Sequence, residues 1–135
     1  MSARILVLWN QVDDDVYEKW RAEGPRVLEW DPSQPVPQMT TVAEELGGIL
    51  KALAASGHQV TEVNIRDDVQ VLIAALGQHR PDAVLNLIEF FGDDLTHESH
   101  IAGLFELYGI PYTGSRSLAL TLCQQKHRAK ALLRD

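Results

Sequence analysis

Short apolar runs that alternate with segments of helical period constrain the fold of this chain more than any other feature. Residues 5–9 form a continuous, partly β-branched apolar run, which is typical of a strand buried on both faces. The segments 58–64, 83–88 and 110–113 are the further expected strands. Because strands and helices alternate, we expect an α/β fold whose central sheet is mostly parallel, has about four strands and is flanked by helices.

The expected helices lie between these strands, and most of them have recognisable ends. The clearest begins near Thr41, and its apolar face carries Val42, Leu46, Ile49, Leu50 and Leu53. The residues expected to cap or stop the helices are Gly57, Asp67 or Asp68, Thr96, Gly109, and Ser115 or Ser117. A last helix is expected at 124–133. A short helical segment is expected near 16–20, and the prolines between 25 and 37 are expected to prevent regular structure there.

Composition narrows the partners and the cellular compartment. The formal net charge of −7 argues against binding to a nucleic-acid backbone. The single cysteine, Cys123, excludes an intrachain disulfide, and its leucine neighbours suggest a small core residue. No apolar stretch approaches the roughly 20 residues that cross a bilayer, so no membrane contact is expected. We therefore expect a cytoplasmic protein.

Several common motifs are absent or too weak to use. The turn after the first strand, residues 10–15, has no glycine, which excludes a dinucleotide fingerprint. Neither a P-loop nor a G-x-S-x-G elbow occurs. The acidic runs 13–15 and 93–94 and the pair His97 and His100 could hold a cation, but solvated surface residues are the commoner explanation, and we predict no metal site.

The segment from Ala83 to the end carries the most specific pattern. Residues 85–89, at the end of an expected strand, read LNLIE, and an acidic loop with Gly92 follows them. Residues 104–115 read LFELYGIPYTGS. A Lys-x-x-x-Lys motif stands at 126–130. Together these features resemble the D-alanine–D-alanine ligase family and its ligase-like relatives. The second half of the chain matches in motif and the first half only in layout.

The resemblance implies that residues 1–135 form a single N-terminal domain, the Rossmann-like preATP-grasp domain, which has three layers. The ATP-grasp catalytic domain would be a missing partner. In the family, this domain forms one wall of a site at which a carboxylate is phosphorylated by ATP and then joined to an amine. ATP and magnesium are therefore implied for the full-length enzyme. Neither is expected in this chain alone, which should be inactive.

The resemblance also implies roles for individual residues. The family lysine that contacts ATP corresponds to Lys126. Candidate substrate-binding residues are Asn86, Glu89 and Ser115, and no catalytic or metal-ligating residue is assigned. The implied substrate is a small amino acid or carboxylate, and a homodimer is a further implied partner.

Two departures from the family keep alternatives open. The family has His-Gly where this chain has Glu89-Phe90, which reverses the local charge preference. Glu89 could bind an amine or could simply lie exposed at the strand end. The glycine-rich loop and glutamate that follow the family's first strand are not found in residues 9–15. The alternative function is a non-catalytic α/β binding, regulatory or dimerisation module.

Overall fold

A computed structural model describes residues 2–11, 27–28, 31–35, 42–92 and 94–134 of the protein. Its central sheet has three parallel strands in the order β4-β1-β5, namely β4 (Gln59–Asn64), β1 (Arg4–Trp9) and β5 (Ala83–Asn86). The predicted parallel α/β sheet is confirmed. The predicted fourth strand at 110–113 forms only one parallel bridge, from Val84 to Tyr112. Proline at position 111 cannot donate to the ladder, which keeps this pairing short.

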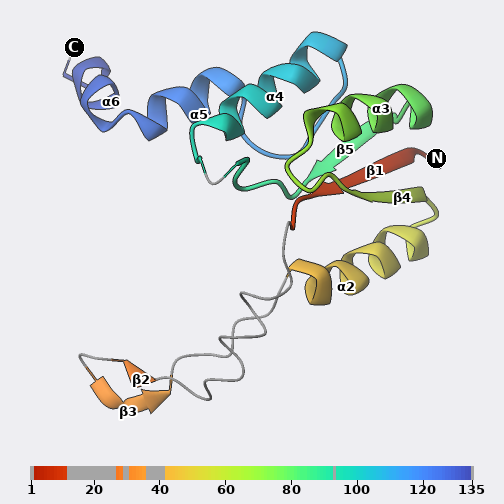
Figure 1. Ribbon diagram of the computed structural model, residues 1–135, viewed down its shortest axis with the longest axis horizontal. Helices are drawn as coiled ribbons and strands as arrows, with labels where there is room; N and C mark the ends of the chain where they lie inside the picture. Colours follow the sequence, from red (N-terminus) through yellow and green to blue (C-terminus); the bar gives the residue numbers. More distant parts are fainter. Residues whose placement is uncertain (1, 12–26, 29–30, 36–41, 93, 135) are drawn as a thin grey trace.

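Helices cover both faces of this sheet. Figure 1 shows α2 (Val42–Ala55) on one face and α3 (Val69–His79) with α4 (His97–Tyr108) on the other. Two short helices, α5 (Ser117–Gln124) and α6 (Lys126–Leu132), follow α4 and extend away from the sheet. The layered arrangement is Rossmann-like, as expected.

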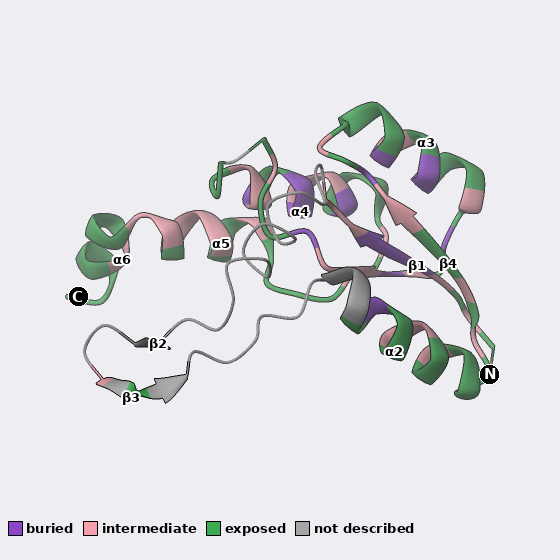
Figure 2. Ribbon diagram, turned by 60° about the horizontal axis from the view of Figure 1, so that its bottom comes forward, coloured by how far each residue is buried: buried purple, intermediate pink, exposed green. Residues whose placement is uncertain are grey.

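The main core lies between the sheet and the α3–α4 layer. Side chains alternate along a strand, so Leu6 and Leu8 of β1 point to this layer while Val7 points to the other face. All three are fully buried. The buried core residues from the other elements are Ile65, Leu72, Ala75, Leu76, Val84, Ile88, Ile101 and Phe105. Figure 2 shows the buried residues of this core as purple segments in β1, α3 and α4, whereas α5 and α6 are pink and green because they bury no residue.

Several of the residues predicted to cap or stop helices do so in the structure. Asp68 caps α3, because its carboxylate accepts a hydrogen bond of 2.7 Å from the Gln70 amide. Thr96 is the N-cap residue of α4, but its hydroxyl donates to Asp94 instead of capping the helix. Hydrogen bonds from the Thr96 hydroxyl and amide lower the pKa of Asp94. Gly57 and Gly109 follow the ends of α2 and α4 as predicted.

Other predictions need correction or lie outside the described residues. Strands β2 (Val27–Leu28) and β3 (Asp31–Pro35) form an antiparallel hairpin where we expected no regular structure. A two-stranded ribbon consists only of edge strands, where proline is tolerated. Cys123 is exposed and not a core residue, because it lies on α5, a helix that buries no residue. The helical segment expected near 16–20 lies outside the described part. No helix among the described residues is long and apolar enough to cross a membrane.

Candidate functional site at the carboxyl edge of the sheet

The strand order places a topological switch point between β1 and β5. The chain leaves β1, crosses over α2 to β4 on one side, and then crosses over α3 to β5 on the other side. After β5 the chain continues through α4 to Tyr112, which bridges Val84 on the far side of β5. The connections that leave the carboxyl ends of β1 and β5 therefore run in opposite directions. Open parallel sheets bind their ligands at such switch points. The candidate site is thus built from the residues that follow these two strands.

Asn64 holds the chain segment that leaves β1. Its side-chain oxygen accepts a hydrogen bond of 3.0 Å from the Gln11 amide, and its side-chain nitrogen donates to the Gln11 carbonyl at 3.0 Å. The same oxygen accepts from the Arg66 amide at 3.0 Å. A single asparagine at the end of β4 therefore satisfies three backbone groups that no strand ladder reaches.

Asn10 links the same edge to β5. Its side-chain nitrogen donates to the Asp67 carboxylate at 2.7 Å and also to the Phe90 carbonyl. Arg66 and Asp67 have φ values of 46° and 57°, a left-handed conformation that costs energy for residues other than glycine. This strained turn places the Asp67 carboxylate against Asn10. The ends of β1, β4 and β5 are therefore tied together by polar side chains.

The end of β5 carries two of the predicted substrate-binding residues. Asn86 is half-buried; its backbone amide donates to the Thr113 hydroxyl at 2.9 Å, and its side-chain oxygen accepts from the Ile88 amide at 3.4 Å. Glu89 is exposed, and its carboxylate has no hydrogen-bond or ion-pair partner among the described residues. The structure thus places, beside the switch point, a carboxylate that has no partner in the described ranges.

The third predicted substrate-binding residue, Ser115, lies on the neighbouring connection. Thr113, which contacts Asn86, is two residues before it. The Tyr112 hydroxyl donates to the Ser115 carbonyl at 3.3 Å, and the Ser115 side chain is exposed. Asn86, Glu89 and Ser115 therefore belong to adjacent connections at the carboxyl edge.

Lys126, the predicted ATP ligand, is not brought to this cluster by the described part of the chain. It is the exposed first residue of α6. Figures 1 and 2 both show α6 beyond the far end of α5, away from the sheet. Lys126 is therefore open to solvent, and among the described residues no hydrogen bond or ion pair joins it to Asn86, Glu89 or Ser115.

The histidine pair at the start of α4 has no third His, Cys, Asp or Glu ligand beside it among the described residues. The rings of His97 and His100 lie 5.6 Å apart, and His97 Nδ1 is 2.8 Å from the Phe91 carbonyl oxygen. That contact leaves His97 Nε2 as the ring nitrogen without a hydrogen-bond partner in the described part of the chain, and a metal would need further ligands beside this pair. No group of three or more His, Cys, Asp or Glu side chains in the described ranges could hold an ion.

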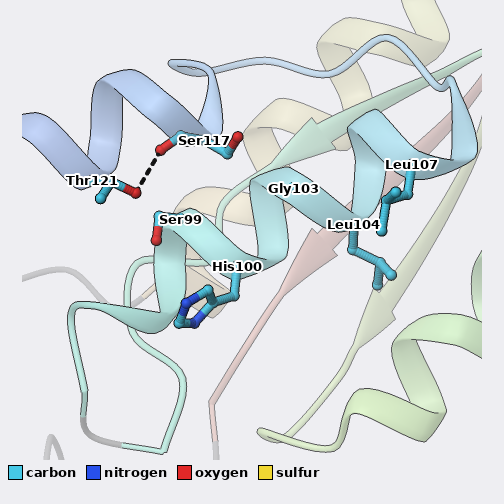
Figure 3. A pocket seen from close by; sticks show the side chains of 7 residues that line it. All are labelled: Ser99, His100, Gly103, Leu104, Leu107, Ser117 and Thr121. Atoms are coloured by element: carbon cyan, nitrogen blue, oxygen red, sulfur yellow. Dashed lines mark hydrogen bonds between the residues drawn. The ribbon is translucent and has the colours of Figure 1, made fainter.

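An open hollow of about 450 Å³ lies between α4 and α5. Figure 3 shows its lining side chains, which come from α4 (Ser99, His100, Gly103, Leu104, Leu107) and α5 (Ser117, Thr121). The Thr121 hydroxyl donates to the Ser117 carbonyl at 2.9 Å, so it could only accept a hydrogen bond from a ligand. The hollow is thus a groove between two helices and holds no cluster of ionisable groups.

Glu106 is a polar residue of the structure that the sequence did not single out. Its carboxylate accepts three hydrogen bonds from Tyr112 and Ser117, at the corner between α4 and α5. The bonds from the Ser117 hydroxyl and amide, followed by that from Tyr112, lower the pKa of Glu106. Its position inside the LFELYGIPYTGS segment was the available signal, but the partners could not be read from spacing alone.

These features define an α/β, Rossmann-like domain with polar side chains at the carboxyl edge of its sheet, between β1 and β5. No family model matches the chain. Curated relatives do: a D-alanine–D-alanine ligase of Methylocella silvestris is 44% identical over 85 residues, which are 62% of this chain and 25% of that protein. A ligase of the same name from Methylorubrum extorquens strain PA1 is 41% identical over 85 residues, with the same shares. One from Rhodospirillum rubrum is 38% identical over 81 residues, 59% of this chain and 26% of that protein.

The relatives confirm the resemblance to D-alanine–D-alanine ligases. The chain spans about a quarter of the length of the curated relatives it matches. The relationship therefore rests on one region of those enzymes.

Proposed function

We propose that this chain forms one wall of the active site of an ATP-dependent carboxylate–amine ligase. Its identity of 38–44% to D-alanine–D-alanine ligases carries the proposal. The topological switch point between β1 and β5 supports it, because parallel α/β domains bind ligands at such points. The remaining parts of the active site would come from an ATP-grasp domain that follows in sequence.

The reaction we propose has two steps. The terminal phosphoryl group of ATP moves to a substrate carboxylate oxygen, which gives ADP and an acyl phosphate. An amine nitrogen then attacks the acyl carbon, phosphate leaves, and the nitrogen loses a proton as the amide bond forms. Both steps depend mainly on positioning and on stabilisation of phosphate charge.

Glu89 is the residue we assign to an amine. Its exposed carboxylate at the end of β5 lacks a described partner, so it can accept charge-assisted hydrogen bonds from a substrate ammonium group. Asn86 lies three residues before it and Ser115 on the neighbouring connection, and their side chains can contact the polar atoms of a small amino acid or carboxylate. A histidine at position 89 would be less able to attract a cation, so the substrate of this chain can differ from that of the relatives.

Lys126 is the residue we assign to ATP. A lysine ammonium is a compact charge that suits a phosphate oxygen, and the residue is exposed at the start of α6. The described residues offer no group that could hold the magnesium ions implied for such an enzyme. We therefore assign no step to a metal ion in this domain.

The proposal is tested in a chimera that joins residues 1–135 to the ATP-grasp portion of the Methylocella silvestris ligase, in register with that relative. We expect ADP and phosphate release that depends on an added amino acid. In the chimera, Glu89→Gln should raise the KM of the amine substrate by about 10-fold or more and leave the KM of ATP unchanged. Lys126→Ala should do the reverse. Glu62→Gln and Lys51→Ala, at exposed positions on β4 and α2, are the matched controls.

The outcomes separate the two candidate functions. A folded chimera that releases no ADP with any of the twenty amino acids or their D-forms would exclude the ligase assignment and favour a non-catalytic module. Equal kinetics for Lys126→Ala and Lys51→Ala would remove Lys126 from the site. The chain alone should release no ADP with D-alanine, and micromolar ATP binding by calorimetry would contradict the assignment of ATP to a following domain.

A further inference from the structure

Helix α5 has no fully buried apolar residue, and its best-covered leucines, Leu120 and Leu122, are only half-buried. None of its residues is buried, and Leu118 has 69% of its surface exposed. By contrast, α4 buries Ile101, Ala102 and Phe105 against the sheet. A helix of this length is marginal in water without tertiary contacts. The position of α5 therefore depends on the polar groups that hold it.

The Glu106 carboxylate supplies that contact at the start of α5. One oxygen accepts from the Ser117 amide at 3.0 Å and from the Tyr112 hydroxyl at 2.9 Å, and the other accepts from the Ser117 hydroxyl at 2.7 Å. The N-cap residue itself, Arg116, makes no side-chain capping bond. A residue from α4 thus caps α5 with a negative charge, which the positive end of a helix dipole favours.

A second polar contact holds the other end of α5. The Gln124 side-chain nitrogen donates to the Leu95 carbonyl at 2.6 Å, in the loop before α4. At the first end, Gly103 of α4 also faces Ser117, since a Cβ built on Gly103 would lie 3.7 Å from the Ser117 Cβ. Figure 3 shows α4 and α5 side by side along this contact. Helix α5 is therefore fixed along α4 at both ends.

The orientation of α5 decides where Lys126 lies. Only Gln125 separates the last residue of α5 from Lys126, and α5 and α6 are in contact. We propose that Glu106 is a positioning residue for Lys126: by capping α5 from α4, it sets the direction in which α6 presents the lysine. This inference rests on the proposed role of Lys126 in binding ATP.

The charges around Glu106 agree with this role. Ser117 contacts the Glu106 carboxylate from α5, and Tyr112 contacts it from the segment between α4 and α5. The positive charge of the Arg116 guanidinium also favours the ionised carboxylate. Because hydrogen bonds from Ser117 lower its pKa, the carboxylate stays ionised below the usual range. Burial, with a smaller effect of the Glu106 hydrogen bond, raises the pKa of Tyr112, so this hydroxyl remains a donor at neutral pH. The cap is lost only when the pH falls through the folded-state pKa of Glu106.

The first experiment measures amide hydrogen exchange in this chain. In Glu106→Ala the amides of Ser117 and of residues 121–124 should exchange at least about 10-fold faster, while those of α3 stay unchanged. Glu106→Gln keeps an acceptor oxygen and should restore part of the protection. Glu62→Ala is the control, since Glu62 is exposed on β4. Unchanged protection of the α5 amides in Glu106→Ala would overturn the proposal. If Glu106→Ala does not fold, Ser117→Ala tests the same contact, because it removes one of the three hydrogen bonds.

The second experiment uses the chimera and measures ATP kinetics. Glu106→Ala should raise the KM of ATP several-fold, and the effect should disappear when Lys126 is already alanine, because the two residues act through one contact with ATP. An equal effect of Glu106→Ala in both backgrounds would overturn the positioning role, while the Lys126→Ala effect would still support the ligase function. A normal KM for Lys126→Ala would instead remove the assumption on which this inference rests.

Discussion

The sheet with α3 and α4 and the α5–α6 segment are stabilised by different forces. The first region is built around side chains with almost no exposed surface, such as Leu6, Leu72 and Phe105. The second buries no residue among its two helices and is attached through Glu106 and Gln124. Each buried side chain of an apolar core contacts many others, so the loss of one lowers the stability of the whole region. A polar attachment depends on single groups, so the α5–α6 segment should respond to changes that leave the sheet intact.

The largest effect should come from the apolar side of this comparison. Phe105 is fully buried, and its ring lies 5.2 Å from that of Tyr112. Phe105→Ala removes the largest side chain of the core and should lower the free energy of unfolding by about 3–5 kcal/mol. Urea denaturation measures the loss. The matched control, Leu118→Ala on α5, should change it by less than about 0.5 kcal/mol; similar losses in both variants would mean that the two regions are not held differently.

A smaller loss is expected from the polar contacts at the carboxyl edge. Asn64→Ala removes three hydrogen bonds to backbone groups of Gln11 and Arg66, and should destabilise the domain by about 1–3 kcal/mol. Gln59→Ala, at the opposite and exposed end of β4, is the control. If Asn64→Ala unfolds at the same urea concentration as the control, the carboxyl edge is not organised by this side chain.

The corner between the two regions depends on one backbone conformation. Gly109 ends α4 with φ 66°, and the Ile110 amide returns to the Phe105 carbonyl. Gly109→Ala forces a side chain into this left-handed conformation and should cost about 1 kcal/mol. Arg80 ends α3 with φ 42°, so Arg80→Gly should change stability in the opposite direction. Thermal denaturation should show a loss of stability for Gly109→Ala and a gain for Arg80→Gly. A Gly109→Ala domain as stable as the parent would show that the backbone at residue 109 can leave the left-handed conformation at no cost.

The sequence predicted the core region well because its signals are local. The apolar run of β1, the acidic cap of α3 and the glycine that ends α4 each depend on residues within one element or turn. The Glu106 cap was missed because its partner Ser117 is eleven positions away across a bridge strand. The error at Cys123 also comes from tertiary structure. Leucine neighbours predict burial only if their helix packs on a core, and α5 buries no residue. Ligand-binding roles remain predictions, because the fold gives the positions of the residues and not what they bind. This holds for Asn86, Glu89, Ser115 and Lys126.

The smallest effect should come from the ion pair at the amino edge of the sheet. Arg4 Nη2 lies 2.7 Å from Asp82 Oδ1, and hydrogen bonds from the Arg4 side chain and amide lower the pKa of Asp82 from 3.8 to about 2. A lowered pKa stabilises the fold above the unfolded-state value, so this contribution is lost as the pH falls from about 4 to about 2. Both groups are at the surface, where solvent screening keeps such pairs weak.

NMR titration of the Asp82 carboxyl group measures this pKa directly. In Arg4→Gln the pKa should rise toward the ordinary value but not reach it, because the backbone amide of residue 4 still donates to the carboxylate. Asp82→Asn should leave neutral-pH stability almost unchanged, since the strands it joins are held by the apolar core. A fall in stability as large as that of Asn64→Ala would contradict the comparison, because it would show that a surface charge, and not the buried side chains, keeps β1 beside β5.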